Sequence, residues 1–268
     1  MKKSKMLWIL CSALLLINLV EYTTIWGGEV FLTYFSDILA FLFAFIATVC
    51  LFFAVKAFKE CDSTKKAWLS IFIGIATYTT AELIYAVLEL VLKLDMDVVY
   101  PSLADYFWVI AYIPLLIGIL MMFFVYKKSG FPMGKPAYYV TISIISLLIM
   151  VLVIYFLLIP IVLDDETSLL AKIFYLFYPI GDVLVLIPVF LLMYITSLFG
   201  KGALSKPWKY LAIGFFIFTV ADILYAYLDW QGLYGSGSYI DLLFNSGYMF
   251  IGLAGLYQKE LVESFKGE

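Results

Sequence analysis

The 268-residue sequence contains no histidine and no arginine, and all 17 of its basic residues are lysines. Without histidine it lacks the side chain that most often serves as a general base or a metal ligand near neutral pH. Without arginine it lacks the planar guanidinium that binds phosphate or carboxylate through two hydrogen bonds. These absences exclude histidine-based catalysis and arginine clamps, and we expect no nucleic-acid partner.

Cysteine is also scarce, and Cys11, Cys50 and Cys61 show no Cys-x-x-Cys spacing. A disulfide framework or a zinc site is therefore not expected. Neither a Gly-Lys-Ser/Thr phosphate loop nor a His-Glu-x-x-His motif is present. We predict a protein that is not an enzyme and has no cofactor. An intramembrane enzyme using paired carboxylates is the least favoured of three functional hypotheses.

Hydrophobic residues make up 65% of the chain and charged residues only 14%. About 20 apolar residues suffice to cross a bilayer as a helix, so the composition predicts an all-α polytopic membrane protein with eight transmembrane helices. The first apolar stretch also resembles a signal peptide, but no small-x-small cleavage site follows it, and we expect a retained helix. The predicted spans are 6–22, 30–55, 67–92, 103–126, 137–163, 169–199, 207–229 and 239–257.

The lysines are segregated along this eight-helix topology. All except Lys93 and Lys172 fall on one side of the predicted bundle. Because positive residues gather in cytoplasmic loops, both termini are expected in the cytoplasm. A seven-helix topology would scatter the lysines over both sides, so their distribution also supports the number of helices.

An internal duplication is the most informative positive feature. Residues 65–89 align with residues 205–229 at a constant offset of 140. The alignment pairs Trp68 with Trp208, Gly74 with Gly214, Ala81 with Ala221, Glu82 with Asp222, Tyr85 with Tyr225 and Glu89 with Asp229. Acidic side chains within apolar helices are costly in lipid, so their recurrence in both copies calls for a physical reason.

Each copy contains four predicted helices, which is an even number, so both copies insert in the same direction. The sequence thus predicts two parallel four-helix repeats, residues 1–130 and 131–268, related by a pseudo-twofold axis along the membrane normal. In this arrangement Asp37, early in the second helix, corresponds to Asp182 in the sixth.

Glu82 and Asp222 are the leading candidate site residues, because each lies only a few residues outward of its helix midpoint. They are either hydrogen-bonded acids that hold helices together or a site for a ligand, a proton or a cation. Glu89 and Asp229 follow seven residues later, on the same helical face. They are either interfacial acids beside an aromatic belt or part of an outward-facing, cation-attracting mouth.

Tyr85 and Tyr225 lie between these acids, so each copy carries an acidic, tyrosine-lined strip. Asp182 follows Pro179 and Gly181, and a second proline, Pro188, comes six residues later. We expect these residues to interrupt the sixth helix, as in transporters that bind substrates at broken helices, although simple proline kinks are also common.

Two further acids begin helices. Asp105 follows Ser102 by three residues, and Asp241 follows Ser238 by three. Ser-x-x-Asp resembles a capping box, in which the serine and the acid satisfy free backbone N–H groups. We interpret Asp105 and Asp241 as mainly structural, and most of the 21 tyrosines and 24 phenylalanines as packing or lipid-facing groups.

The run from Pro101 through Asp105, Tyr112 and Gly118 resembles a pattern in prokaryotic multi-helix membrane sensor regions that precede GGDEF, PAS or histidine kinase domains. Asp222 and Tyr225, followed by Gly232, Tyr234, Gly237 and Asp241, resemble a second copy. The resemblance covers about half the chain and implies a sensor in a prokaryotic cell membrane. No output domain follows in this sequence, so we expect either a stand-alone relative that acts through a cytoplasmic signalling partner or the membrane part of a longer protein.

Two functional hypotheses follow. The first is a sensor or receptor that binds a small molecule or cation in an outer acidic, tyrosine-lined pocket between the repeats. The alternative is a small secondary transporter or channel that couples to protons or cations through its intramembrane carboxylates. Flux across liposomes that depends on Glu82 and Asp222 would distinguish the alternative from the first.

Overall fold

The computed structural model describes residues 2–59, 62–96, 98–198 and 202–265. Within these ranges there is no strand, and eight spans are long and apolar enough to cross a membrane, as predicted. The helices are α1 Lys3–Thr24, α2 Glu29–Ala57, α3 Ser63–Ala86, η1 Val87–Val91, α4 Leu103–Lys128, α5 Pro136–Val153, η2 Ile154–Leu158, α6 Ile159–Leu163, α7 Leu169–Ser197, α8 Lys206–Trp230 and α9 Tyr239–Ser264. The π-helical turn η1 extends α3, and α5, η2 and α6 together form the fifth span.

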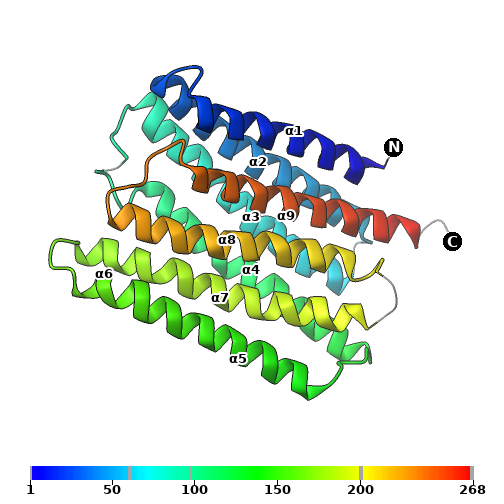
Figure 1. Cartoon of the computed structure of the whole chain (residues 1–268). Helices are drawn as coiled ribbons and strands as arrows, with labels where there is room; N and C mark the ends of the chain where they lie inside the picture. Colours follow the sequence, from blue (N-terminus) through cyan, green and yellow to red (C-terminus); the bar gives the residue numbers. More distant parts are fainter. Residues whose placement is uncertain (1, 60–61, 97, 199–201, 266–268) are drawn as a thin grey trace.

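Six of the helices form a closed ring. Packing contacts run from α2 to α3, α4, α7, α8 and α9 in turn, and α9 closes the ring against α2. Outside it, α1 packs mainly against α9 and α5 against α7 (Figure 1). The two chain termini lie at one end of the bundle, and the α3–α4 and α8–α9 loops lie at the other. The interior of the ring is therefore bounded by helices from both halves of the chain.

Two of the repeated glycines allow neighbouring helices to approach closely. A Cβ atom added to Gly74 would lie 2.5 Å from Leu115 Cγ, and one added to Gly214 would lie 2.7 Å from Ile251 Cγ1. Small residues at such positions let membrane helices pack through backbone-level contact. The recurrence of this glycine in the sequence thus has a packing reason at both the α3–α4 and the α8–α9 interface.

The end of the ring nearer the termini is filled by aromatic side chains. Trp68 and Trp208 are fully buried, and their ring centroids lie 5.2 Å apart. The indole N–H of Trp208 donates a 3.1 Å hydrogen bond to the hydroxyl of Tyr126. A buried indole is stable when its N–H has such a partner. These side chains close the interior of the ring toward the termini.

The predicted interruption of the sixth span is wrong, because α7 is one continuous helix that contains both Pro179 and Pro188. Each proline removes only one hydrogen bond of the helical ladder, and its fixed φ is compatible with a helix. Asp182 is therefore presented by a regular helical turn and is buried.

Two of the cysteines, Cys11 and Cys50, are free thiols buried between the helices. Cys61 lies outside the described residues.

Candidate functional site

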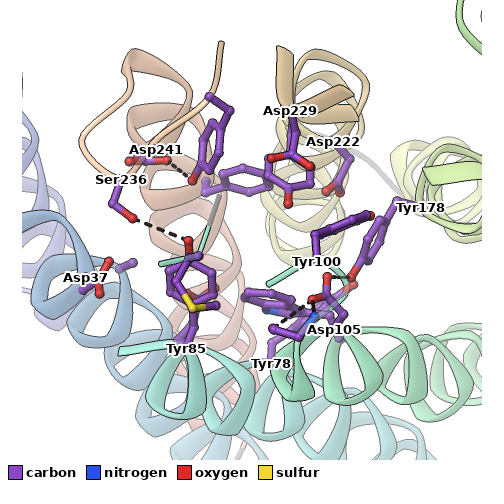
Figure 2. A pocket seen from close by; sticks show the side chains of 18 of the residues that line it. Asp37, Tyr78, Tyr85, Tyr100, Asp105, Tyr178, Asp222, Asp229, Ser236 and Asp241 are labelled. Carbon is purple, nitrogen blue, oxygen red and sulfur yellow. Dashed lines mark hydrogen bonds between the residues drawn. The ribbon is translucent and has the colours of Figure 1, made fainter. Parts of the chain in front are cut away.

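A cavity of about 1030 Å³ lies inside the helical ring, at the end opposite the termini (Figure 2). Side chains of α2, α3, α4, α7, α8 and α9 line it, together with residues of the loops before α4 and α9. The lining includes Ser36, Asp37, Tyr78, Glu82, Tyr85, Met96, Tyr100, Asp105, Trp108, Tyr112, Tyr178, Phe218, Asp222, Tyr225, Asp229, Tyr234, Ser236, Asp241, Phe244 and Tyr248.

The structure brings most of the sequence-predicted site residues to this cavity. The six that line it are Asp37, Glu82, Tyr85, Asp222, Tyr225 and Asp229. The two others, Glu89 and Asp182, lie behind the lining and contact residues of the wall. Thus all eight predicted residues belong to one region of the fold, although they come from α2, α3, η1, α7 and α8.

Several tyrosine–carboxyl hydrogen bonds cross between the halves of the chain, two of them at acids predicted from the sequence. The Tyr248 hydroxyl donates to Glu82 Oε1 at 2.6 Å, and the Tyr112 hydroxyl donates to Asp182 Oδ1 at 2.7 Å. Asp222 lies beside Asp182, within interaction range of its carboxyl group. Glu82 and Asp222 are half-buried, and both line the cavity. Phenolic donors thus hold Glu82 and Asp182 in place.

Among the acids that line the cavity, Asp37 has a buried carboxyl oxygen without a hydrogen-bond partner in the described part of the chain; Asp182, behind the lining, has one too. Asp37 is 6% exposed, and its Oδ2 atom accepts no hydrogen bond from any described residue. Buried polar atoms are nearly always hydrogen-bonded, and an exception often marks an unoccupied ligand or water position. Asp37 faces the cavity from α2, across from Asp105 on α4 (Figure 2).

The first predicted capping box forms, and the second does not. Ser102 and Asp105 make the reciprocal hydrogen bonds of the box at the start of α4. Ser238 caps nothing at the start of α9, because Asp241 instead accepts from the Gly237 N–H at 2.9 Å and from Ser36 Oγ at 2.9 Å. The bond from Ser36 draws this acid toward α2.

Both acids also accept a phenolic hydrogen bond and line the cavity. Tyr178 donates to Asp105 at 2.7 Å, and Tyr234 donates to Asp241 at 2.9 Å. The structure therefore places these two acids in the candidate site, in addition to their role at helix starts.

The two copies of the acidic strip differ at their outer ends. Asp229 remains on the regular helix α8 and lines the cavity, where the Tyr175 hydroxyl donates to it at 2.5 Å. Glu89 lies in the π-helical turn η1, which has more residues per turn than an α-helix and changes the direction of its side chain. Glu89 accepts a 2.7 Å hydrogen bond from Ser236 of the opposite loop. It thus fastens the loop over the cavity instead of lining it.

Sequence reasoning found only part of the aromatic lining, namely Tyr85 and Tyr225 of the repeated strips. Eight of the cavity residues are tyrosines, and Trp108, Phe218 and Phe244 join them. For the other aromatic residues the sequence signal was the high aromatic content, which does not tell where a side chain points, because such residues also face lipid and fill cores.

The loop tyrosines close the cavity from above. Tyr100 stacks on Tyr175 with centroids 4.6 Å apart, and Tyr234 packs edge-to-face on Tyr225 at 4.8 Å. Burial raises the pKa of Tyr100 and of Tyr234 well above the usual value, and in Tyr234 the negative charge of Asp241 adds to the effect. The two hydroxyl groups therefore stay protonated at neutral pH; that of Tyr234 donates to Asp241, whereas that of Tyr100 has no hydrogen-bond partner among the described residues.

A separate polar cluster lies where α1 packs on α9. Asn18, Glu21 and Asn245 are fully buried, and none of their side-chain oxygen or nitrogen atoms has a hydrogen-bond partner in the described part of the chain. Their neighbour Tyr22 shares a 2.7 Å hydrogen bond with Ser36, which lines the cavity. The cluster adjoins the wall of the cavity without forming part of it.

At the end of the bundle that contains the cavity, hydrogen bonds to Asp164 organise the loop before α7. Hydrogen bonds from the Thr167 hydroxyl, the Trp230 indole and the Glu166 backbone N–H lower the pKa of this exposed carboxyl to about 2. The bond from Trp230 ties this loop to the end of α8.

Within the described residues, no group of three or more Asp, Glu or Cys side chains has the geometry of a metal site. No protein family, curated protein or solved structure matches this chain. The chemistry of the cavity itself is consequently the basis for assigning a function.

Proposed function

We propose that this protein is a membrane receptor or sensor that binds a small ligand in the cavity between its two halves. The observation that carries the proposal is the cavity itself: about 1030 Å³ in volume, it is lined by acids and tyrosines from six helices. A ligand held there would contact both halves at once. Its binding would therefore change how the halves pack against each other.

The proposal includes two parallel repeats with both termini in the cytoplasm of a prokaryotic cell. Equivalent packing contacts support the repeats. Gly74 packs on Leu115, and Gly214 packs on Ile251 in the same way. The separation in sequence between Leu115 and Ile251 equals that between Tyr112 and Tyr248. The lysine distribution supports the orientation, because it places the termini inside and the cavity outside.

The closed cytoplasmic half favours a receptor over a channel. The Trp68–Trp208 pair and Tyr126 fill the ring below the cavity. A transport pathway would have to separate these buried side chains. A receptor needs only a small change in the packing of α4 and α9, which a cytoplasmic signalling partner would detect.

Transport remains the second candidate function because of the neighbouring acids Asp182 and Asp222 in the membrane-embedded part of the cavity wall. Two carboxyl groups so near each other can exchange a proton, or can release a proton when a cation binds. Proton or cation flux into liposomes that disappears in the Glu82→Gln/Asp222→Asn double variant would favour transport. Equal flux with and without the protein would exclude it.

Ligand-dependent thermal stability of the detergent-purified protein tests the receptor. A ligand that binds only the folded state raises the melting temperature in proportion to its concentration relative to Kd. We expect a stabilising ligand among a panel of small molecules, and loss of the shift in the Glu82→Gln/Asp222→Asn variant. Glu29→Gln is the matched control, because Glu29 is an exposed acid at the start of α2 and does not line the cavity. Unchanged shifts in the double variant would place binding elsewhere and refute the proposal.

A further inference from the structure

The described lining of the cavity contains several acidic side chains and no basic side chain that would balance their negative charge. Asp37, Glu82, Asp105, Asp222 and Asp241 line it, and no lysine is among its described lining residues. The only ion pair in the described part of the chain, Lys259–Glu263, lies at the far end of α9. A low-dielectric cavity walled by several acids concentrates positively charged molecules.

Aromatic side chains form the floor and the roof of the cavity. On the floor, Phe218 packs edge-to-face on Tyr248 at 4.8 Å and on Tyr78 at 6.1 Å. In the roof, Tyr225 packs on Tyr234 from the loop before α9. Aromatic faces attract ammonium groups and also accommodate hydrocarbon chains. Acids together with aromatic faces fit a cation that carries an apolar body.

The arrangement of the acids does not favour a bare metal ion as the occupant of the cavity. The described residues form no group of three or more metal-ligating acids. The aromatic side chains of the lining suit an organic ligand better than an ion with its water shell.

The Asp37 oxygen that has no hydrogen-bond partner further limits the class of ligand that fits the cavity. Most cavity acids already accept a hydrogen bond from a tyrosine or serine, whereas Asp37 Oδ2 accepts none from the described residues. An N–H donor on the ligand would satisfy this atom, and a quaternary ammonium group, which has no N–H, would not. The combination indicates a protonated amine.

We propose that the cavity binds an aliphatic amine or polyamine, with a protonated amino group at Asp37 and the carbon chain between the aromatic floor and roof. This inference rests on the proposed function, because it names the ligand class of the same cavity. It is independent of whether binding leads to signalling or to transport.

The charge preference of the cavity is measurable without knowing the ligand. A cysteine introduced by Ser236→Cys lies on the cavity wall, whereas Leu233→Cys lies on the exposed surface of the same loop. Each variant is labelled with cationic, neutral and anionic methanethiosulfonate reagents, and the unsubstituted chain gives the background. Ala40→Cys, on α2 within the cavity, repeats the measurement without altering the loop.

We expect the cationic-to-anionic rate ratio in the cavity to exceed that at Leu233→Cys by about tenfold, as electrostatic focusing predicts. Adding Asp37→Asn is expected to lower the ratio severalfold, and adding Glu29→Gln, which removes an exposed charge from the same helix, to leave it unchanged. With the neutral reagent, 1,4-diaminobutane is expected to slow labelling in the cavity, and butane-1,4-diol is not.

The outcomes separate the two proposals. If the neutral reagent labels Leu233→Cys and neither cavity position, the cavity is inaccessible and the proposed function fails. If it labels the cavity positions without a preference for cations, or if the diol protects as well as the diamine, only the amine inference is overturned. Protection by tetramethylammonium equal to that by the diamine overturns the role of Asp37 as acceptor for an N–H donor.

Discussion

Removing the phenol of Tyr248 while keeping its ring tests whether the halves are joined through the cavity acids. Its hydroxyl donates a 2.6 Å hydrogen bond to Glu82, and Tyr248 itself is 2% exposed. Tyr248→Phe deletes the donor and leaves the packing against Phe218 intact. Glu82→Gln removes the charge with little change of shape. The double variant completes a thermodynamic cycle that isolates the interaction from the effects of each change alone.

The expected coupling energy follows from the geometry. Hydrogen bonds between membrane helices average about 0.6 kcal/mol in such cycles and reach about 1.7 kcal/mol. Bonds to charged acceptors are worth about 1.5–3 kcal/mol in soluble proteins. Because this bond is short and buried and has a carboxyl acceptor, we expect a coupling of about 1–2 kcal/mol. Reversible unfolding in mixed micelles, followed by tryptophan fluorescence, measures it.

A second cycle is provided by Tyr112→Phe and Asp182→Asn, which break another tyrosine–carboxyl bond, of 2.7 Å, donated in the opposite direction between the halves. Because this bond also joins a buried phenol to a carboxyl group at a similar distance, we expect a coupling energy of the same size, about 1–2 kcal/mol. Couplings below about 0.3 kcal/mol in both cycles would refute the reasoning, because the acids would then contribute nothing to the contact between the halves.

Three further predictions concern stability. Gly118→Ala should destabilise the protein by about 1–3 kcal/mol, because the added Cβ would lie 2.7 Å from a backbone oxygen of α3. Gly235→Ala is the control and should be neutral, because there is open space around its Cβ. Equal melting temperatures of the two variants would contradict this prediction. Glu21→Met should stabilise the protein by about 1 kcal/mol in unfolding experiments, because the buried carboxyl has no hydrogen-bond partner among the described residues; a large loss of stability would reveal a partner. The hydrogen bond from Thr167 and the other donors lower the pKa of Asp164 to about 2. The ionised carboxyl therefore contributes stability that is complete above about pH 4 and is lost as the pH falls through 2. Asp164→Asn should remove that part of the acid dependence in a pH titration of the melting temperature, and an unchanged profile would contradict the assignment.

The local properties of the chain were sufficient to predict its eight spans. Apolar stretches of about 20 residues have few alternatives to a membrane helix, because a lipid environment requires every backbone polar group to be satisfied within the segment. The constant offset of 140 also identified Glu82 and Asp222 as equivalent, since this comparison needs only the linear sequence. Six of the eight predicted site residues line one cavity. Acids inside apolar helices avoid lipid and face the interior of the bundle.

The direction of individual side chains was decided by tertiary structure. A single π-helical turn displaces Glu89 from the strip it shares with Glu82, and no sequence signal marks that turn. The loop before α9 brings Tyr234 over the cavity, although it is far in sequence from the opposite wall. The packing of α1 on α9 buries Glu21 without a hydrogen-bond partner in the described part of the chain. Helix formation depends on neighbours along the chain, whereas the cavity depends on contacts between helices that are distant in sequence, and only the packed bundle determines these.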